Sequence, residues 1–253
     1  MIEISCKDTI LGMGEVGSTI FQLLNEVVPL EGVDIDKTKE RKKTAFNHEQ
    51  TYFLHICIPY SEGFRDAVLD TTKKYKPRAV IIHSTVPPRT TQKLQEILHK
   101  IPIISAPTRG VHRNFLSDMK RYTKIFAVDK KFVGTEEYNE FIKRFNDAGV
   151  KVESMSSTTT TELAKILTDT TYYGWLITYA QITKILADKY GVDYDEMWKF
   201  ADEIQKFLGN RPKMFPGFIG GHCVMNNLEL IKESDIFSEV ADIMKEMNLR
   251  YKK

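Results

Sequence analysis

The sequence predicts an α/β domain built on a doubly wound parallel sheet, followed by an all-helical domain. Short apolar runs alternate with amphipathic helical patterns over the first half of the chain, which is typical of a parallel sheet with helices on both faces. A glycine-rich turn, Gly12 to Gly17, separates the first apolar run from the first helical pattern. Beyond residue 155 the periodic segments are helical. We therefore expect two domains, residues 1–155 and 156–253.

Each expected element has its own apolar pattern. We expect strands at residues 9–11, 32–36, 52–58, 79–82, 101–104 and 124–128, with an edge strand at 151–153. Helical spacing is clear in 18–27 and in 136–145. In the second domain we expect one long helix over 158–190, another over 195–208, a Pro/Gly-rich segment over 209–221 and a last helical region to the C-terminus.

The composition excludes several classes of protein. The formal net charge of +2 on 253 residues argues against nucleic acid or an anionic membrane as the partner. The three widely spaced cysteines, Cys6, Cys57 and Cys223, form neither a disulfide framework nor a zinc motif, so no metal is expected. The N-terminus is unlike a signal peptide, and no apolar run reaches the length of a membrane span. We expect a cytoplasmic protein.

The glycine-rich turn fits the G-x-G-x-x-G fingerprint of a Rossmann-type dinucleotide site. Gly12 permits the tight turn, Gly14 lets the backbone approach a pyrophosphate, and Gly17 lets the helix pack closely on the strand. The helix that follows opens with Glu15 and Val16, and we include both in the cofactor site. At the end of the next strand lies Asp34, with Asp36 as the second candidate for the ribose hydroxyls. An acid there favours NAD over NADP.

Four further motifs follow along the chain: His55-Ile56-Cys57-Ile58-Pro59, Ser84-Thr85-Val86-Pro87-Pro88-Arg89-Thr90-Thr91, Thr161-Glu162-Leu163-Ala164-Lys165, and Pro216-Gly217-Phe218-Ile219-Gly220-Gly221-His222-Cys223. In this order they resemble the UDP-glucose/GDP-mannose dehydrogenase family, in a short form that lacks the C-terminal nucleotide-binding domain. The second resembles the signature Ser-Thr-Val-Pro-Pro-Gly-Thr-Thr of the family, and the last resembles its cysteine loop.

The resemblance implies a specific chemistry. In this family NAD receives two hydrides while an alcohol becomes a carboxylate, and a cysteine holds the intermediate aldehyde. Cys223 would be that nucleophile and Lys165 would stabilise the substrate oxygen. The substrate would be a small molecule, and the resemblance implies a nucleotide sugar. The resemblance also assigns the cofactor contacts to Pro59, Ser84 and Thr85, and the substrate contacts to Thr108, Arg109, Gly220, Gly221 and His222.

The chain departs from the family pattern at three positions near these motifs. Asp169 stands where the family has asparagine, and Asn227 stands where it has aspartate. We interpret this as a swap that keeps one carboxylate and one amide beside Lys165. Thr108 replaces a glutamate that helps to activate water in the family, and a threonine is no general base near neutral pH. The nearest titratable candidate for that role is His112.

Other interpretations of the same residues remain open. A two-electron enzyme resembling the β-hydroxyacid dehydrogenases would not need Cys223, and an NAD-binding protein without turnover would serve as a partner or regulator. The basic segment after the fifth expected strand is either an anion site or a solvated basic loop, and it contains Arg109, His112 and Arg113. His222 either braces its loop or moves protons. The resemblance implies a homodimer through the helix over 158–190.

Overall fold

The computed structural model describes residues 6–42, 50–110, 114–220, 223–231 and 235–252. These residues form two compact units, Met1–Lys165 and Ile166–Lys253, each described by itself. The functional division at residue 155, with an NAD-binding and a dimerisation domain, stays a prediction.

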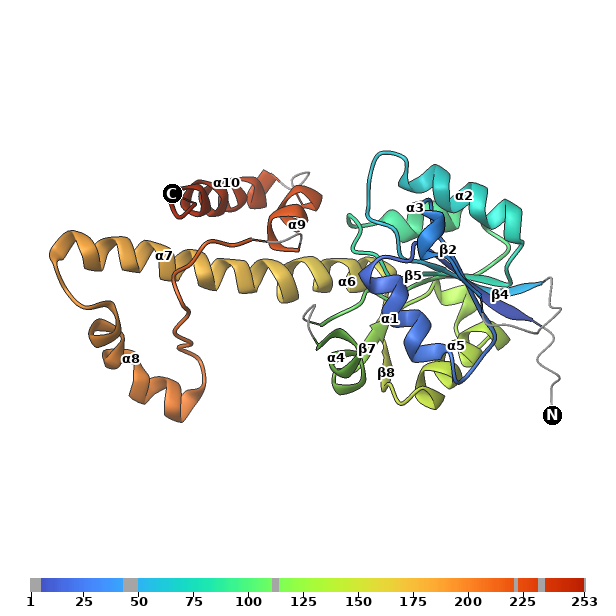
Figure 1. Ribbon diagram of the computed structural model, residues 1–253, viewed down its shortest axis with the longest axis horizontal. Helices are drawn as coiled ribbons and strands as arrows, with labels where there is room; N and C mark the ends of the chain where they lie inside the picture. Colours follow the sequence, from blue (N-terminus) through green and yellow to red (C-terminus); the bar gives the residue numbers. More distant parts are fainter. Residues whose placement is uncertain (1–5, 43–49, 111–113, 221–222, 232–234, 253) are drawn as a thin grey trace. The chain divides into compact units, whose positions relative to one another are not determined.

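The first unit is built on a six-stranded sheet in the order β3-β2-β1-β4-β5-β6 (Figure 1). The strands are β1 (Lys7–Leu11), β2 (Leu30–Val33), β3 (Arg41–Lys42), β4 (Thr51–Ile56), β5 (Ala79–Ile82) and β6 (Ile103–Ser105). All neighbours are parallel except β2 and β3. The chain runs from β1 outward to β2 and then returns to β4 on the other side of β1. Such a reversal opens a crevice at the carboxyl ends of the strands, where open α/β sheets bind ligands.

Helices cover both faces of this sheet, which confirms the predicted fold class. One face packs against α1 (Glu15–Leu24), α4 (Phe115–Arg121) and α5 (Glu136–Asp147), and the other against α2 (Phe64–Tyr75) and α3 (Thr90–Ile97). Within β4, Phe53 enters the first core and Leu54 the second, because successive side chains of a strand point to opposite faces. Both faces are therefore apolar, as the continuous apolar runs predicted.

The segment expected as the sixth strand joins a separate pair. β7 (Lys124–Phe126) runs parallel to β8 (Val152–Ser154), close to the predicted edge strand. The pair reaches the main sheet through an antiparallel bridge in which Ser105 and Ala127 exchange backbone hydrogen bonds of 2.9 Å. The end of β7 therefore lies beside the end of β6.

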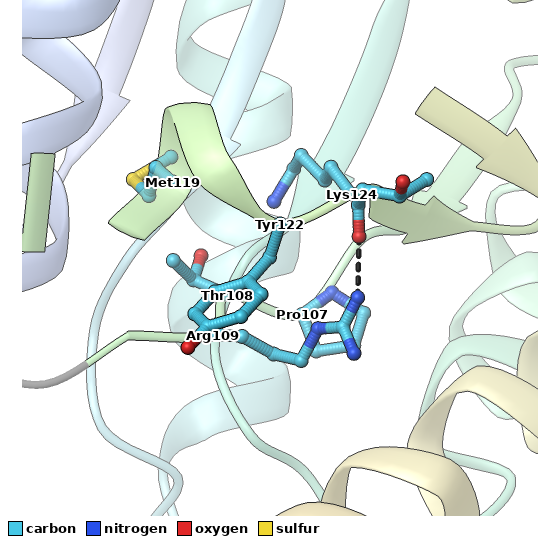
Figure 2. A pocket seen from close by; sticks show the side chains of 7 residues that line it. Pro107, Thr108, Arg109, Met119, Tyr122 and Lys124 are labelled. Carbon is cyan, nitrogen blue, oxygen red and sulfur yellow. Dashed lines mark hydrogen bonds between the residues drawn. The ribbon is translucent and has the colours of Figure 1, made fainter. Parts of the chain in front are cut away.

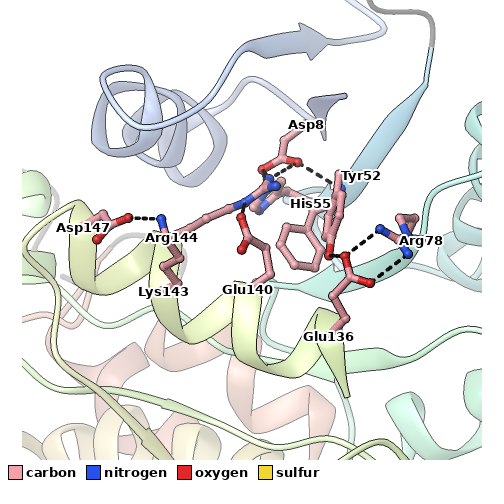
Figure 3. Close-up of polar contacts among 10 residues, drawn as sticks. Asp8, Tyr52, His55, Arg78, Glu136, Glu140, Lys143, Arg144 and Asp147 are labelled. Carbon is pink, nitrogen blue, oxygen red and sulfur yellow. Dashed lines mark hydrogen bonds and ion pairs between the residues drawn. The ribbon is translucent and has the colours of Figure 1, made fainter. Parts of the chain in front are cut away.

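A buried ion pair lies under the first face of the sheet (Figure 3). Asp8 is fully buried in β1, and Arg144 of α5 donates through Nη1 to both carboxylate oxygens at 2.6 Å. Phe53 N–H and His55 Nε2 also contact this carboxylate, at 3.0 Å and 3.4 Å. Burial alone would raise the pKa of Asp8, but Arg144 and His55 hold that pKa below its usual value. The pair joins α5 to the interior of the sheet.

Two buried histidines extend this network towards the carboxyl ends of the strands. The Nδ1 atom of His55 lies 2.9 Å from Nε2 of His83, and the rings are stacked with an interplanar angle of 6°. The Nδ1 atom of His83 lies 3.2 Å from the carbonyl oxygen of Ala106. Burial lowers the pKa of His83 well below its usual value, so this imidazole is neutral.

The second unit is helical. Its helices are α7 (Tyr172–Tyr190), α8 (Tyr194–Leu208), α9 (Val224–Leu230) and α10 (Asp235–Arg250). A small core joins α7, α9 and α10, with Val224, Leu228 and Met244 buried. Gly174 of α7 makes this approach possible, because a Cβ atom there would lie 2.3 Å from Val224 Cγ1. The glycine in the aromatic stretch of the long helix therefore serves packing.

The long helix expected over 158–190 is not α-helical throughout. It begins as α6 (Thr158–Leu163), continues as the π-helical segment η4 (Ala164–Thr171) and resumes as α7. Ser157 caps its start by accepting from Thr160 N–H at 3.1 Å, and Gly191 ends it with φ +65°. The 3.6-residue pattern could not distinguish the π-helical turns, which are often found at functional sites.

Candidate functional site

The glycine loop is shaped by contacts with the end of β4. Gly12 has φ +91°, and a Cβ atom on it would lie 2.8 Å from Ile58 Cγ2 and 3.0 Å from the carbonyl carbon of Cys57. A Cβ atom on Gly17 would lie 1.8 Å from the carbonyl oxygen of Gly12. Any side chain at either position would displace backbone. The close approach of α1 to the loop therefore requires both glycines.

Gly14 differs from its two neighbours in the fingerprint. Among the described residues, a Cβ atom on Gly14 would meet no atom within 4 Å, and no side chain caps α1 at this N-cap residue. Glu15 is exposed and Val16 is half-buried at the start of the helix. Helix geometry leaves the first-turn N–H groups without intrahelical acceptors, so an anion would be stabilised there. The open space lies where the fingerprint expects the pyrophosphate.

Asp34 follows β2 and holds the same loop. Its Oδ2 accepts from the backbone N–H of Met13 at 2.6 Å, and its Oδ1 accepts from that of Asp36 at 2.9 Å. The N–H of Gly12 donates to Val33 O at 2.9 Å. Asp36, the second candidate, instead accepts from Thr38 and caps a 3₁₀ turn. The structure thus brings Asp34, and not Asp36, to the glycine loop.

The predicted residues on β4 and β5 meet at the same edge of the sheet. Ser84 Oγ donates to Ile58 O at 2.6 Å, so the turn after β5 is joined to the turn after β4. Pro59 follows Ile58 and is exposed, while Thr85 follows Ser84 and is half-buried. Since Ile58 also borders Gly12, the fold brings the segments carrying Gly12, Pro59 and Ser84 together.

Glu162 is a structural residue for which sequence analysis found no role. Its carboxylate is buried in α6 and accepts from Arg89 N–H at 2.6 Å, Thr91 N–H at 2.8 Å and Thr91 Oγ1 at 2.7 Å. Arg89 adopts φ +69°, a left-handed conformation, where the family signature has glycine. Burial raises the pKa of Glu162 although these hydrogen bonds oppose it. Glu162 therefore fixes the start of α3 and the turn that carries Ser84.

A small pocket opens beside Thr108 and Arg109 (Figure 2). It is lined by Pro107, Thr108, Arg109, Met119, Tyr122, Thr123 and Lys124. Arg109 donates through Nη2 to Thr123 O and lies over the Tyr122 ring, 5.8 Å from its centroid. The Thr108 hydroxyl is buried and has no hydrogen-bond partner among the described residues. His112 and Arg113, expected in the same loop, lie outside those residues.

Lys124 is the second residue that sequence analysis missed. It is buried at the start of β7, and its Nζ donates to Ala106 O at 2.8 Å. Burial lowers the pKa of Lys124 to about 7, with repulsion from Arg109 and Lys165 acting in the same direction. In the sequence Lys124 is one lysine among many on a short strand, and only the folded chain shows that it borders Thr108.

The candidate catalytic residues divide between the two units. Lys165 ends the first unit, while Asp169 and Cys223 belong to the second. Lys165 and Asp169 both lie in the π-helical segment, and Cys223 is exposed just before α9. Asn227 is buried in α9 and donates through Nδ2 to Thr170 Oγ1 at 2.7 Å. The fold therefore brings Asn227 to the residue next to Asp169.

Other predicted positions carry less structural information. Gly220 is exposed, while Gly221 and His222 lie outside the described residues. Within those residues, no group of three His, Cys, Asp or Glu side chains could hold a metal ion. No helix in the described part of the chain has the length and apolar character needed to cross a membrane.

Comparisons with known proteins identify relatives. The chain matches no protein-family profile. It is 26% identical over 204 residues to UDP-N-acetyl-D-mannosamine dehydrogenase from Methanococcus vannielii, covering 74% of this chain and 44% of that protein. It is 28% identical over 147 residues to the protein of the same name from Methanococcus maripaludis, with 57% and 32% covered. The chain thus spans less than half the length of these curated relatives.

Solved structures share the fold. UDP-D-ManNAc dehydrogenase from Pyrococcus horikoshii superposes with a TM-score of 0.78 at 19% identity, covering 95% of this chain and 68% of that one. 3-Hydroxyisobutyrate dehydrogenase from Mycobacterium tuberculosis superposes with a TM-score of 0.71 at 15% identity, covering 97% and 94%. The chain is a Rossmann-type α/β unit followed by a helical unit. The sequence relatives support the resemblance of its motifs to nucleotide-sugar dehydrogenases, and the solved structures share its fold.

Proposed function

We propose that the chain is an NAD-dependent oxidoreductase that oxidises a primary alcohol, with a nucleotide sugar as the substrate class. The observation that carries this proposal is the glycine loop. Two of its glycines are required by packing, while Gly14 leaves open space at the N-terminus of α1. The carboxylate of Asp34 lies against the loop, where it would favour a free ribose hydroxyl over a 2′-phosphate. The residues present therefore fit NAD.

The cofactor would be held by the backbone of the loop and by the neighbouring turns. The amides at Gly14, Glu15 and Val16 would face the phosphates. The turns after β4 and β5 would line the other side of the cofactor site, where Pro59, Ser84 and Thr85 would contact the cofactor. NAD, when bound, supplies the acceptor for the hydride. The protein residues bind and orient the reactants and move protons.

Cys223, Lys165, Asp169 and Asn227 would carry the chemistry on the substrate. The first oxidation converts the alcohol to an aldehyde, and the Cys223 thiolate adds to the aldehyde carbon while its oxygen takes a proton. A second hydride loss gives a thioester, and water then releases the carboxylate and restores the thiol. The Lys165 ammonium would stabilise negative charge on the oxygen. Two hydrides leave each alcohol in this sequence.

The pairing of Asp169 with Asn227 would keep one carboxylate and one amide in the site. In support, Asn227 is hydrogen-bonded to Thr170, which adjoins Asp169. Substrate contacts would come from Thr108, Arg109, Gly220, Gly221 and His222. A homodimer through residues 158–190 and a cytoplasmic location complete the proposal. Exposed aromatic residues on α7, including Tyr172 and Tyr173, support the dimer.

A second candidate is a two-electron dehydrogenase of small hydroxy acids. The observation in its favour is Thr108, whose hydroxyl lies at the predicted water-activating position and cannot act as a base near neutral pH. In that case the reaction would stop after one hydride, and Cys223 would be dispensable. A third candidate, an NAD-binding partner protein, would show cofactor binding with no turnover.

The test is the amount of NADH formed per substrate molecule consumed, measured with a panel of UDP-sugars and small hydroxy acids. The proposal predicts two NADH per substrate, and Cys223→Ser should abolish the carboxylate product. Cys6→Ser is the matched control, because Cys6 is half-buried outside the predicted site and should leave the yield unchanged. One NADH per substrate with full activity in Cys223→Ser would establish the second candidate. NAD binding without turnover would establish the third.

A further inference from the structure

The pocket beside Thr108 is rich in positive charge. Arg109 and Lys124 are among its lining residues, and none of the seven residues that line it is acidic. The buried Arg144 and the part-buried Lys7 have carboxylate partners, Asp8 and Glu31. No such partner is among the residues that line this pocket.

The burial of Lys124 makes the lack of an acidic partner costly, because this lysine is only 6% exposed. The titratable groups that shift its pKa are Cys57, Arg109 and Lys165, and the pKa of His83 is in turn affected by Lys124. None of these four is a carboxylate. A buried ammonium without a counter-charge is strongly unfavourable, so an anion in the pocket would stabilise the charged form.

Thr108 gives an independent indication of a ligand. Its hydroxyl oxygen is buried, its residue is 7% exposed, and it has no hydrogen-bond partner within the described residues. Buried hydroxyl groups in proteins nearly always have a partner. A hydroxyl can donate to an anionic oxygen, and hydrogen bonds to charged groups are the stronger ones. Thr108 and Lys124 border the same pocket (Figure 2).

We propose that this pocket binds an anionic oxygen group, a carboxylate or a phosphoryl group, between Lys124 Nζ, the Arg109 guanidinium and the Thr108 hydroxyl. The pocket is small, so it receives the anionic end of a larger ligand. Arg109 is held in place by Thr123 O and the Tyr122 ring, which leaves less side-chain entropy to lose on binding. The site lies within the first unit and needs neither Cys223 nor turnover.

The test is an NMR titration of the full chain, without NAD, using acetate in one arm and inorganic phosphate in the other. We expect saturable shifts of the amides around residues 107–109 and 122–124. Lys124→Met should weaken binding at least tenfold at pH 6.5. Lys131→Met is the matched control, because Lys131 is exposed in the same unit. This variant should bind the anions with the affinity of the native protein. Tighter acetate binding would assign a carboxylate ligand, and tighter phosphate binding would assign a phosphoryl ligand.

A second variant, Thr108→Val, tests the same site if Lys124→Met fails to fold. Thr108→Val keeps the shape of the side chain and removes the hydroxyl, so we expect several-fold weaker binding of the same anion. Acetate stays ionised from pH 6 to 8.5, while Lys124 loses its proton near pH 7 in the free protein. The affinity of the native protein for acetate should therefore fall as the pH rises from 6 to 8.5. The affinity of Lys124→Met should not change with pH.

Two results would overturn the proposal. One is native-like affinity in both Lys124→Met and Thr108→Val, which would place the anion elsewhere. The other is the absence of saturable binding of either anion to the native protein at pH 6.5. Because no cofactor or turnover is involved, these results leave the dehydrogenase proposal untouched. Conversely, an inactive protein that binds acetate through Lys124 would refute the dehydrogenase and keep the anion site.

Discussion

The two glycine-rich loops of this chain differ in what requires their glycines. In the first loop, a Cβ atom on Gly17 would lie 1.8 Å from backbone, so the fold itself requires glycine. In the second loop, counting the described residues other than its chain neighbours, a Cβ atom on Gly220 would lie no closer than 3.6 Å to another atom, and one on Gly217 would meet the Phe215 ring at 3.3 Å. Packing within the described chain therefore explains the first loop and leaves the second unexplained.

This difference separates structural from functional glycines. Gly14 lies in the first loop, but it resembles the glycines of the second loop because its surroundings are open. A glycine with free space around it adds nothing to packing and has a cost in backbone entropy. Such a glycine is therefore explained by a ligand that approaches the backbone closely. Substitutions at these positions test which glycines are required by packing.

The largest expected effect is that of Gly17→Ala. The new methyl group would overlap the carbonyl oxygen of Gly12, so α1 must move away from the loop. We expect a loss of about 3 kcal/mol or more in the free energy of unfolding. Gly14→Ala is the control and should cost about 1 kcal/mol or less while weakening NAD binding. Urea unfolding and NAD titration measure both quantities, and equal stability losses in the two variants would contradict the comparison.

An intermediate effect is expected for Glu162→Ala, which tests whether the turn after β5 is fixed as firmly as the glycine loop. The substitution leaves the N–H groups of Arg89 and Thr91 without their buried acceptor. We expect a loss of about 2 kcal/mol in unfolding free energy. Glu162→Gln keeps one acceptor oxygen and should lose about half as much. Chemical denaturation measures both, and a native-like Glu162→Ala would remove the assigned role.

The smallest effect on stability is expected for Gly220→Ala. The methyl group has room, and Gly220 lacks a positive φ. The unfolding free energy should therefore change by less than about 0.5 kcal/mol. If a ligand approaches this backbone, turnover should nevertheless fall. Thermal unfolding together with the NADH assay measures the two effects. A large loss of stability would show that the second loop, like the first, is set by packing.

Much of the first unit could be predicted because its rules are local. The strand runs, the fingerprint glycines and Asp34 follow from patterns within a few residues, and the structure places them together. Glu162 and Lys124 could not be found in this way. Glu162 caps a helix more than 70 residues earlier in the chain, and Lys124 gains its character from burial beside Thr108. The π-helical segment was missed because its residues fit an α-helical pattern equally well.

The stacked histidines place protons in a fixed order across the sheet. The carbonyl of Ala106 can only accept, so His83 carries its proton on Nδ1 and presents a lone pair on Nε2. His55 must then carry a proton on Nδ1 to bond to that lone pair. Both donors consequently point the same way, from β4 through β5 towards β6. The interior of the sheet therefore holds two aligned N–H dipoles that run across its strands towards β6, which an apolar core of the same shape would lack.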